Sequence, residues 1–139
     1  MKLSARNQFP GVVAKINKGA VNGIVTIDVN GTPVSATISL NAIAELGLEA
    51  GKKAYAVIKA TEVMIGLGGH LPLSARNQFP GTVLDVTKGA VNSIVKMSVL
   101  GGQTLSATIS NNAVEELGLA PGMEALAVIK ATSVMVGID

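Results

Sequence analysis

The stretch IVTIDVNGTPVSATIS, residues 24–39, carries the clearest structural signal in the sequence. β-Branched apolar residues alternate in it with small or polar ones, and this period of two is typical of strands with one buried face. Asn30 and Gly31 divide the stretch in the middle, and an Asn-Gly pair favours the tight turn of a β-hairpin. The sequence therefore predicts two antiparallel strands that are joined at these two residues.

The segments on either side extend this pattern. GVVAKINKG (residues 11–19) alternates in the same way, and AYAVIKATEVMIG (residues 54–66) predicts a further strand with a break near Lys59. Between them, Ser39 is a suitable N-cap for a short helix over LNAIAEL, and Gly47 is suited to end it. Several short strands with one small helix predict a five-stranded barrel of the oligonucleotide/oligosaccharide-binding (OB) type.

The whole unit occurs twice in the chain. The octapeptide SARNQFPG begins at Ser4 and again at Ser74, and roughly two thirds of the aligned positions that follow are identical. The second copy has an extra Gly, so that Gly101-Gly102 marks its hairpin turn, and its helix is predicted from Ser110 to Gly118. We therefore predict an all-β chain of two tandem small five-stranded OB-like β-barrels, each with one short helix: a first domain over residues 1–67, a linker over residues 68–72 and a second domain over residues 73–139.

Composition excludes several classes of function. Apolar residues make up 48 % of the chain, and the predicted core must be aliphatic because only Phe9, Phe79 and Tyr55 are aromatic. The absence of Cys excludes disulfides, thiolate metal sites and thiol catalysis. The sequence has neither a signal peptide nor an apolar run of about 18 residues, so we expect no membrane partner and a cytoplasmic location.

The polar residues that both copies keep are mostly hydrogen-bond donors. Only three positions are basic in both copies, Arg6/Arg76, Lys18/Lys88 and Lys59/Lys130, and only one carboxylate is shared, Glu45/Glu116. Cationic side chains and the unpaired N–H groups at a helix start form a site for an anion. The two cations Arg6 and Lys59 would balance a dianion, and a site without carboxylates favours a fully deprotonated tetrahedral oxyanion such as sulfate, molybdate or tungstate over phosphate.

Four motifs together resemble one known family. SARNQ, KGAVN, ATISxxAxxELGL and VIKATxVM look like motifs of the molybdate-binding Mop domain, and two copies in tandem resemble the di-domain molbindins. The resemblance covers nearly the whole chain. It implies an OB-type barrel, a homotrimer, and molybdate or tungstate bound at interfaces between domains and subunits. It also implies a role in intracellular molybdenum storage and homeostasis, without a catalytic cofactor.

The resemblance assigns candidate residues position by position. In the first copy, the oxyanion-binding candidates lie in the N-terminal motif, at the helix start and at the last strand, and are Ser4, Ala5, Arg6, Asn7, Ser39, Ala42, Lys59, Ala60 and Thr61. The second copy supplies Ser74, Ala75, Arg76, Asn77, Ser110, Ala113, Lys130, Ala131 and Thr132. The KGAVN loops form a second candidate class of site near a symmetry axis, with Lys18, Gly19, Val21, Asn22, Lys88, Gly89, Val91 and Asn92. No residue is expected to bind a metal cation directly.

Some of these residues also have a purely structural interpretation. Arg6 could pair with Glu45 instead of a ligand, and Asn7 could simply fix the entrance of the barrel. The repeated Met64 and Met135 are expected to fill the core, as methionines usually do.

Three other functions have weaker support from the sequence. An OB-type nucleic-acid-binding module needs aromatic stacking platforms and a basic groove, and three aromatic residues with a net charge of +2 supply neither. No retained catalytic triad, carboxylate pair or P-loop supports an enzyme, so we expect none. The chain could also be a detached oxyanion-sensing effector domain, although the lack of a Walker motif or helix-turn-helix segment favours a free-standing protein.

Overall fold

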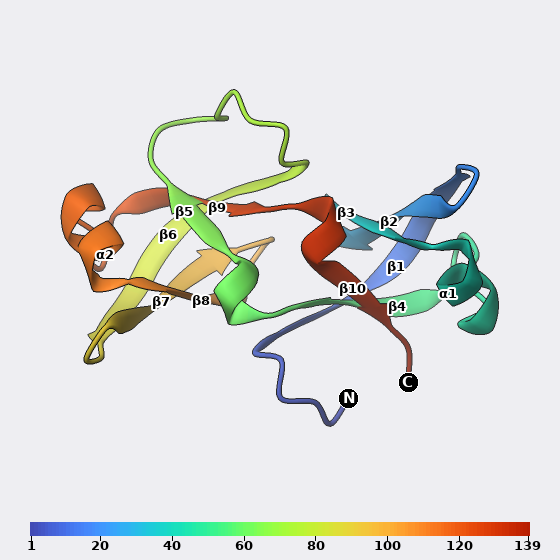
Figure 1. Ribbon diagram of the computed structural model, residues 1–139, viewed down its shortest axis with the longest axis horizontal. Helices are drawn as coiled ribbons and strands as arrows, with labels where there is room; N and C mark the ends of the chain where they lie inside the picture. The colour runs from blue at the N-terminus through green and yellow to red at the C-terminus, as the bar shows by residue number, and fades with distance from the viewer.

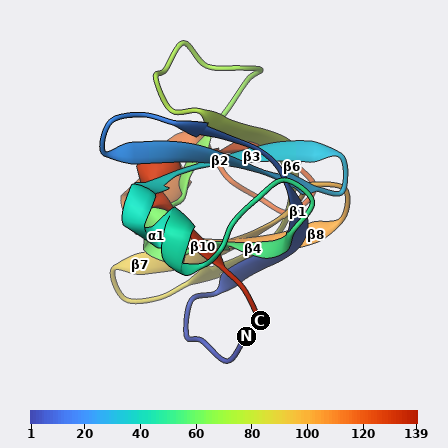
Figure 2. The ribbon, with the colours of Figure 1, turned by 90° about the vertical axis from the view of Figure 1, so that its right-hand side faces the viewer.

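The computed structural model describes residues 1–139 and contains two curled five-stranded antiparallel sheets, which confirms the predicted all-β fold. The first repeat forms β1 (Asn7–Lys18), β2 (Asn22–Val29), β3 (Thr32–Ser39), α1 (Leu40–Glu45), β4 (Lys53–Ile58), the 3-10 turn η1 (Ala60–Glu62) and β5 (Met64–Gly66). The second repeat forms β6 (Asn77–Lys88), β7 (Asn92–Val99), β8 (Gln103–Ser110), α2 (Asn111–Leu117), β9 (Glu124–Ile129), the 3-10 turn η2 (Ala131–Ser133) and β10 (Val134–Gly137). The two sheets form two lobes along the long axis, with α1 and α2 at opposite ends (Figure 1). Figure 2 looks onto the end that carries α1 and shows the strands of the first sheet curling around a centre.

The last strand of each repeat completes the sheet of the other repeat. The first sheet has the order β10-β4-β1-β2-β3, and the second has the order β5-β9-β6-β7-β8. β10 runs antiparallel to β4, with Val134 opposite Ile58, and β5 runs antiparallel to β9, with Met64 opposite Val128. Each sheet therefore combines four strands of one repeat with one strand of the other, an exchange that the sequence repeat alone does not predict.

The exchange begins at the break expected near Lys59. Lys59 and its counterpart Lys130 precede η1 and η2, which lead the chain from β4 to β5 and from β9 to β10. η1 packs against β8 of the second sheet, and η2 packs against β3 of the first. The Oγ of Ser133 in η2 donates a hydrogen bond of 3.1 Å to Oε2 of Glu62 in η1, so the two crossing segments contact each other directly.

Both helices begin and end at residues that suit these positions. Ser39 and Ser110 are the N-caps of α1 and α2, and the left-handed backbone after each helix lies at Gly47 (φ 60°) and Gly118 (φ 62°). The helices have six and seven residues, and neither is long or apolar enough to cross a membrane.

The core is aliphatic and continuous between the repeats. One cluster of 27 buried residues includes Phe9 and Phe79 and draws on both sheets, so the two lobes share one apolar interior. The glycine that closes the octapeptide is required by close packing. A Cβ at Gly11 would lie 2.4 Å from the carbonyl oxygen of Asp28, and one at Gly81 would lie 2.1 Å from that of Ser98.

The Asn of each SARNQ motif joins the two sheets. The Nδ2 of Asn7 donates to the carbonyl oxygen of Ser106 at 2.9 Å, and the N–H of Ser106 donates to Oδ1 of Asn7 at 2.8 Å. Asn77 forms the same pair of bonds with Ser35, at 2.9 and 2.8 Å. β3 and β8 are edge strands of their sheets, so each buried amide takes the place of a neighbouring strand at that edge. We call these two pairs the asparagine clamps.

Removing one clamp tests its contribution to stability. Asn7→Ala is expected to lower the free energy of unfolding by about 2–4 kcal/mol, because two buried hydrogen bonds are lost and the polar groups of Ser106 keep no partner. Urea unfolding followed by circular dichroism measures the change. Asn41 is also kept in both repeats but is exposed on α1, so Asn41→Ala serves as the matched control. A loss in Asn7→Ala no larger than in the control would contradict the assignment.

Candidate oxyanion-binding site

The N-terminal motif and the turn after β4 lie side by side because β1 pairs with β4. Asn7 at the start of β1 is opposite Ile58 at the end of β4 in the antiparallel register. The residues that precede Asn7 and those that follow Ile58 therefore meet at one end of this strand pair. The register brings together residues 4–6 and residues 59–61, which carry Arg6 and Lys59.

A cavity of about 340 Å³ opens between these two segments. Its wall contains a Ser, an Arg, a Lys and a Thr among small and apolar residues: Leu3, Ser4, Ala5, Arg6, Lys59, Ala60, Thr61 and Met135. Met135 lies on β10 and comes from the second repeat, so the exchanged strand completes the wall.

The second repeat forms the corresponding cavity, with a volume of about 240 Å³. Its wall contains Thr37, Ser74, Ala75, Arg76, Lys130, Ala131 and Thr132. Thr37 lies on β3 of the first repeat, so this cavity also takes residues from both repeats. Neither cavity has a carboxylate in its wall. We call the two walls the first and the second donor set.

The glutamine of each SARNQ motif holds the segment that precedes it. The Nε2 of Gln8 donates to the carbonyl oxygens of Leu3 and Ala5, at 3.2 and 3.1 Å. In the second repeat, the Nε2 of Gln78 donates to Ala75 at 3.3 Å and to Leu71 at 3.1 Å. Because these bonds fold the Ser-Ala-Arg segment back on β1 or β6, the retention of the glutamine has a structural reason.

The cations of the two donor sets differ in their partners. Neither Arg6 nor Arg76 forms an ion pair or a hydrogen bond, so the alternative pairing of Arg6 with Glu45 does not occur in the structure. The Nζ of Lys59 lies 4.0 Å from Oε1 of Glu62, while Lys130 has no such partner. Three of the four cationic groups are therefore free to bind an anion.

Other candidate residues lie outside the two cavities. The side chains of Asn7 and Asn77 are buried and hydrogen-bonded in the asparagine clamps, and neither residue lines a donor set. At the helix starts, the Oγ of Ser39 accepts the N–H of Ala42 at 3.1 Å, and Ser110 and Ala113 form the same bond. These four helix-start residues line neither donor set.

The two KGAVN loops have unequal surroundings. Lys18, Gly19 and Asn22 line a cavity of about 420 Å³, and Thr37 and Arg76 of the second donor set border the same cavity. Val21 lies outside it with its side chain exposed to solvent.

The second loop lines no cavity of this kind. The Nζ of Lys88 lies 3.9 Å from Oε1 of Glu115, and the Nδ2 of Asn111 donates to the carbonyl oxygen of Gly89 at 3.0 Å. Val91 is as exposed as its counterpart, and the carbonyl oxygen of Asn92 accepts the N–H of Gly89. Lys88 and Gly89 of this loop are therefore already bonded to side chains of the second repeat.

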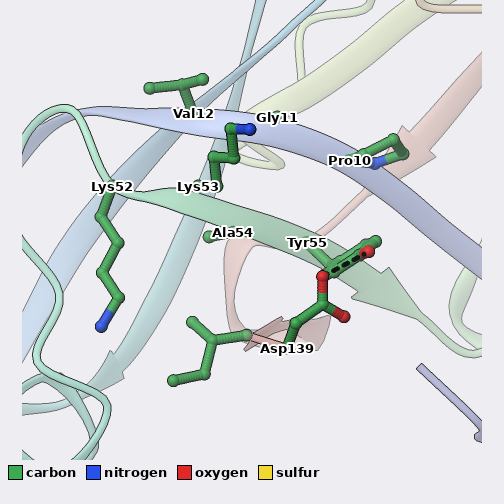
Figure 3. A pocket seen from close by; sticks show the side chains of 9 residues that line it. Pro10, Gly11, Val12, Lys52, Lys53, Ala54, Tyr55 and Asp139 are labelled. Atoms are coloured by element: carbon green, nitrogen blue, oxygen red, sulfur yellow. Dashed lines mark hydrogen bonds between the residues drawn. The ribbon is translucent and has the colours of Figure 1, made fainter.

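The largest cavity lies away from both donor sets. It has a volume of about 620 Å³ and is bordered by β1, β4 and the last two residues of the chain (Figure 3). The Tyr55 hydroxyl donates to Oδ2 of Asp139 at 3.0 Å, and this bond and the negative charge of Asp139 raise the pKa of Tyr55. Lys52 donates to the carbonyl oxygens of Leu46 and Gly47 at the end of α1. The carboxylate of Asp139 would repel an oxyanion, and Lys52 is already hydrogen-bonded to the end of α1. This cavity is therefore unsuited to an oxyanion.

The candidates predicted from the sequence omit three residues of the donor sets, Leu3, Thr37 and Met135. Thr37 lies on β3 of the first repeat and reaches the second donor set because η2 of the second repeat packs against β3. Met135 and its counterpart Met64 were expected in the core, but they are 42 % and 44 % exposed, so that expectation was wrong. The available signal is a Met at the same position of both copies, but the sequence does not show whether such a residue is buried or exposed.

Comparison with protein families identifies the repeated unit. The model of the TOBE domain matches residues 3–65 and again residues 73–136. The chain belongs to the TOBE domain family. The two TOBE domains correspond to the two sequence repeats, although each sheet exchanges its last strand with the other.

Relatives of the tandem TOBE chain are proteins of molybdenum transport and binding. The molybdenum transport protein ModE of Herbaspirillum seropedicae is 43 % identical over 141 residues, which cover 100 % of this chain and 52 % of ModE. The molybdenum-pterin-binding protein MopA of Rhodobacter capsulatus is 34 % identical over 99 % of this chain and 53 % of its own length. The chain thus spans about half the length of these relatives.

One solved structure resembles the tandem TOBE chain over its whole length. It is a crystal structure of the cytoplasmic molybdate-binding protein ModG with molybdate bound, with a TM-score of 0.95 and 42 % sequence identity. The similarity covers 100 % of both chains. The fold of the tandem TOBE chain is therefore known in a molybdate-binding protein.

Proposed function

We propose that this protein binds molybdate or tungstate, and that the two donor sets form the binding sites. The observation that carries the proposal is the composition of the two walls. Each brings a Ser, an Arg, a Lys and a Thr of one repeat to a single cavity without any carboxylate. Hydrogen bonds from cationic donors are the strong ones, and two cations match the charge of one dianion.

The donor sets also favour particular anions. Molybdate, tungstate and sulfate are fully deprotonated near neutral pH and accept hydrogen bonds with every oxygen. Hydrogen phosphate carries a proton that needs an acceptor, and a wall without carboxylates supplies a poor one. Phosphate is therefore expected to compete weakly at pH 7.5, as is sulfate because of its smaller size.

Storage and homeostasis of molybdenum inside the cell fit this chemistry better than catalysis. The relatives carry the names of transport and binding proteins, and the similar ModG is described as cytoplasmic. A site that only donates hydrogen bonds to a stable oxyanion holds its ligand without changing it. We accordingly propose no enzymatic activity and no catalytic cofactor.

An effector module within a longer regulator is the alternative function. The match to half the length of ModE favours it, since the other half of such a relative could carry a further activity. Immunoblotting of native cells separates the two: the storage role predicts a band at the mass of the 139-residue chain. An OB-type nucleic-acid-binding module has less support, because Phe9 and Phe79 are core residues and cannot stack on bases.

We also propose that three copies of the chain assemble into a homotrimer, as the Mop-domain resemblance implies. Exposed apolar side chains at equivalent positions of both repeats support self-association, and they include Leu3, Leu73, Val21, Val91, Met64 and Met135. Val21 and Val91 are 73 % and 72 % exposed, which is costly unless another surface covers them.

Light scattering at micromolar concentration, with and without molybdate, tests the assembly. The proposal predicts three times the mass of the single chain. A monomer under both conditions would rule the trimer out, and the candidate sites would then have to function within one chain.

Calorimetric titration with molybdate, tungstate, sulfate and phosphate tests the function itself. Lys59→Ala is expected to weaken the first donor set about tenfold to a hundredfold, since a charge-assisted hydrogen bond contributes roughly 1.5–3 kcal/mol. Lys130→Ala is expected to do the same to the second set.

Lys15→Ala is the matched control for both lysine variants. Lys15 is exposed on β1, lies outside every cavity described above and is replaced by Asp85 in the second repeat. It is a better control than Lys52, which holds the end of α1. Equal losses in all three variants would indicate diffuse attraction by the net charge, and tight phosphate binding would contradict the donor-only site.

A further inference from the structure

The two donor sets share a Ser, an Arg, a Lys and a Thr at equivalent positions, but the residue that follows this Thr in the sequence differs between them. Each set is followed in the sequence by the last residue of its 3-10 turn, which is Glu62 in η1 and Ser133 in η2. In the sequence, a carboxylate therefore follows the first donor set only. No other acidic residue lies in the Lys-Ala-Thr turn of either repeat.

Glu62 contacts both crossing segments. One carboxylate oxygen, Oε1, lies 4.0 Å from the Nζ of Lys59, and the other, Oε2, accepts the hydrogen bond from Ser133. The side chain of Glu62 is 37 % exposed, compared with 61 % for Lys59. The carboxylate is thus held beside the lysine of the first set by a bond to the turn that belongs to the second set.

We propose that Glu62 makes the two sites of the chain unequal, so that the second donor set binds the oxyanion more tightly than the first. This inference rests on the proposed function, because it assigns an affinity-determining residue to the sites proposed there. An oxyanion that enters the first set must share Lys59 with Glu62 and is repelled by its charge. Lys130 forms no ion pair, and the residue at the equivalent position of its turn is the uncharged Ser133.

The expected difference is moderate, because solvent reaches Glu62. A unit charge a few ångströms from a dianion, in surroundings of intermediate to high dielectric constant, is expected to change affinity about three- to tenfold. Salt screens the interaction, so the difference is expected to shrink as the ionic strength rises. The dependence on salt separates an electrostatic effect from a change of shape.

Exchange of the two side chains is the direct test, with molybdate as the titrant in calorimetry. The wild-type protein is expected to show two affinity classes. Glu62→Ser, which copies the second repeat, is expected to raise the weaker class to the level of the tighter one. Ser133→Glu is expected to lower the tighter class three- to tenfold. Glu62→Gln removes the charge but keeps an oxygen that can accept the Ser133 hydrogen bond, so it should reproduce the gain of Glu62→Ser.

Glu49→Ser is the matched control for the loss of charge. Glu49 is exposed in the segment that follows α1 and has no acidic counterpart in the second repeat. The Glu49→Ser substitution changes the net charge as much as Glu62→Ser does. Equal gains from the two variants would overturn the inference, since the effect would then come from the net charge.

The possible outcomes distinguish a failure of this inference from a failure of the proposed function. Lys59→Ala shows which affinity class belongs to the first donor set. This variant should lower the affinity of the weaker class, and a loss confined to the tighter class would overturn the inference. Molybdate binding in which Glu62→Ser and Ser133→Glu change neither class would overturn the inference and leave the proposed function intact. No binding by the wild-type protein would overturn both.

Discussion

The reciprocal exchange of the final strands is the constraint on which the rest of the structure depends. Each repeat supplies only four strands to its own sheet, because its fifth strand joins the sheet of the other repeat: β5 pairs with β9, and β10 pairs with β4. Units of about 65 residues bury too little surface to be very stable alone. The exchange, the asparagine clamps and the shared core join the two repeats into one folding unit.

The exchange also determines where a ligand could bind. The turn that leads into each exchanged strand carries Lys59 or Lys130, so the cation of each donor set lies where the chain crosses to the other sheet. Met135 and Thr37 reach the two walls from the opposite repeat. A bound oxyanion would contact both repeats, and its binding free energy would add to the stability of the folded chain.

Local features were predictable from the sequence, whereas the pairing of the final strands was not. The Asn30-Gly31 hairpin and the Ser39 cap depend on neighbouring residues, and both lie where the sequence predicts them. The final strands could pair with either repeat, since KAYAVI of β4 and EALAVI of β9 offer almost the same partner. For the same reason, only part of the candidate site could be predicted from the sequence. The β1–β4 register brings Arg6 to Lys59 within one repeat, but Thr37 arrives only through contacts between repeats.

X-ray diffraction from crystals grown with tungstate would show whether each donor set holds one oxyanion. Tungsten scatters anomalously, so its position can be found without reference to the protein model. We expect one strong anomalous peak between Arg6 and Lys59 and another between Arg76 and Lys130, with no protein carboxylate in contact. Peaks that avoid both cavities, or that lie only beside Tyr55 and Asp139, would contradict this expectation.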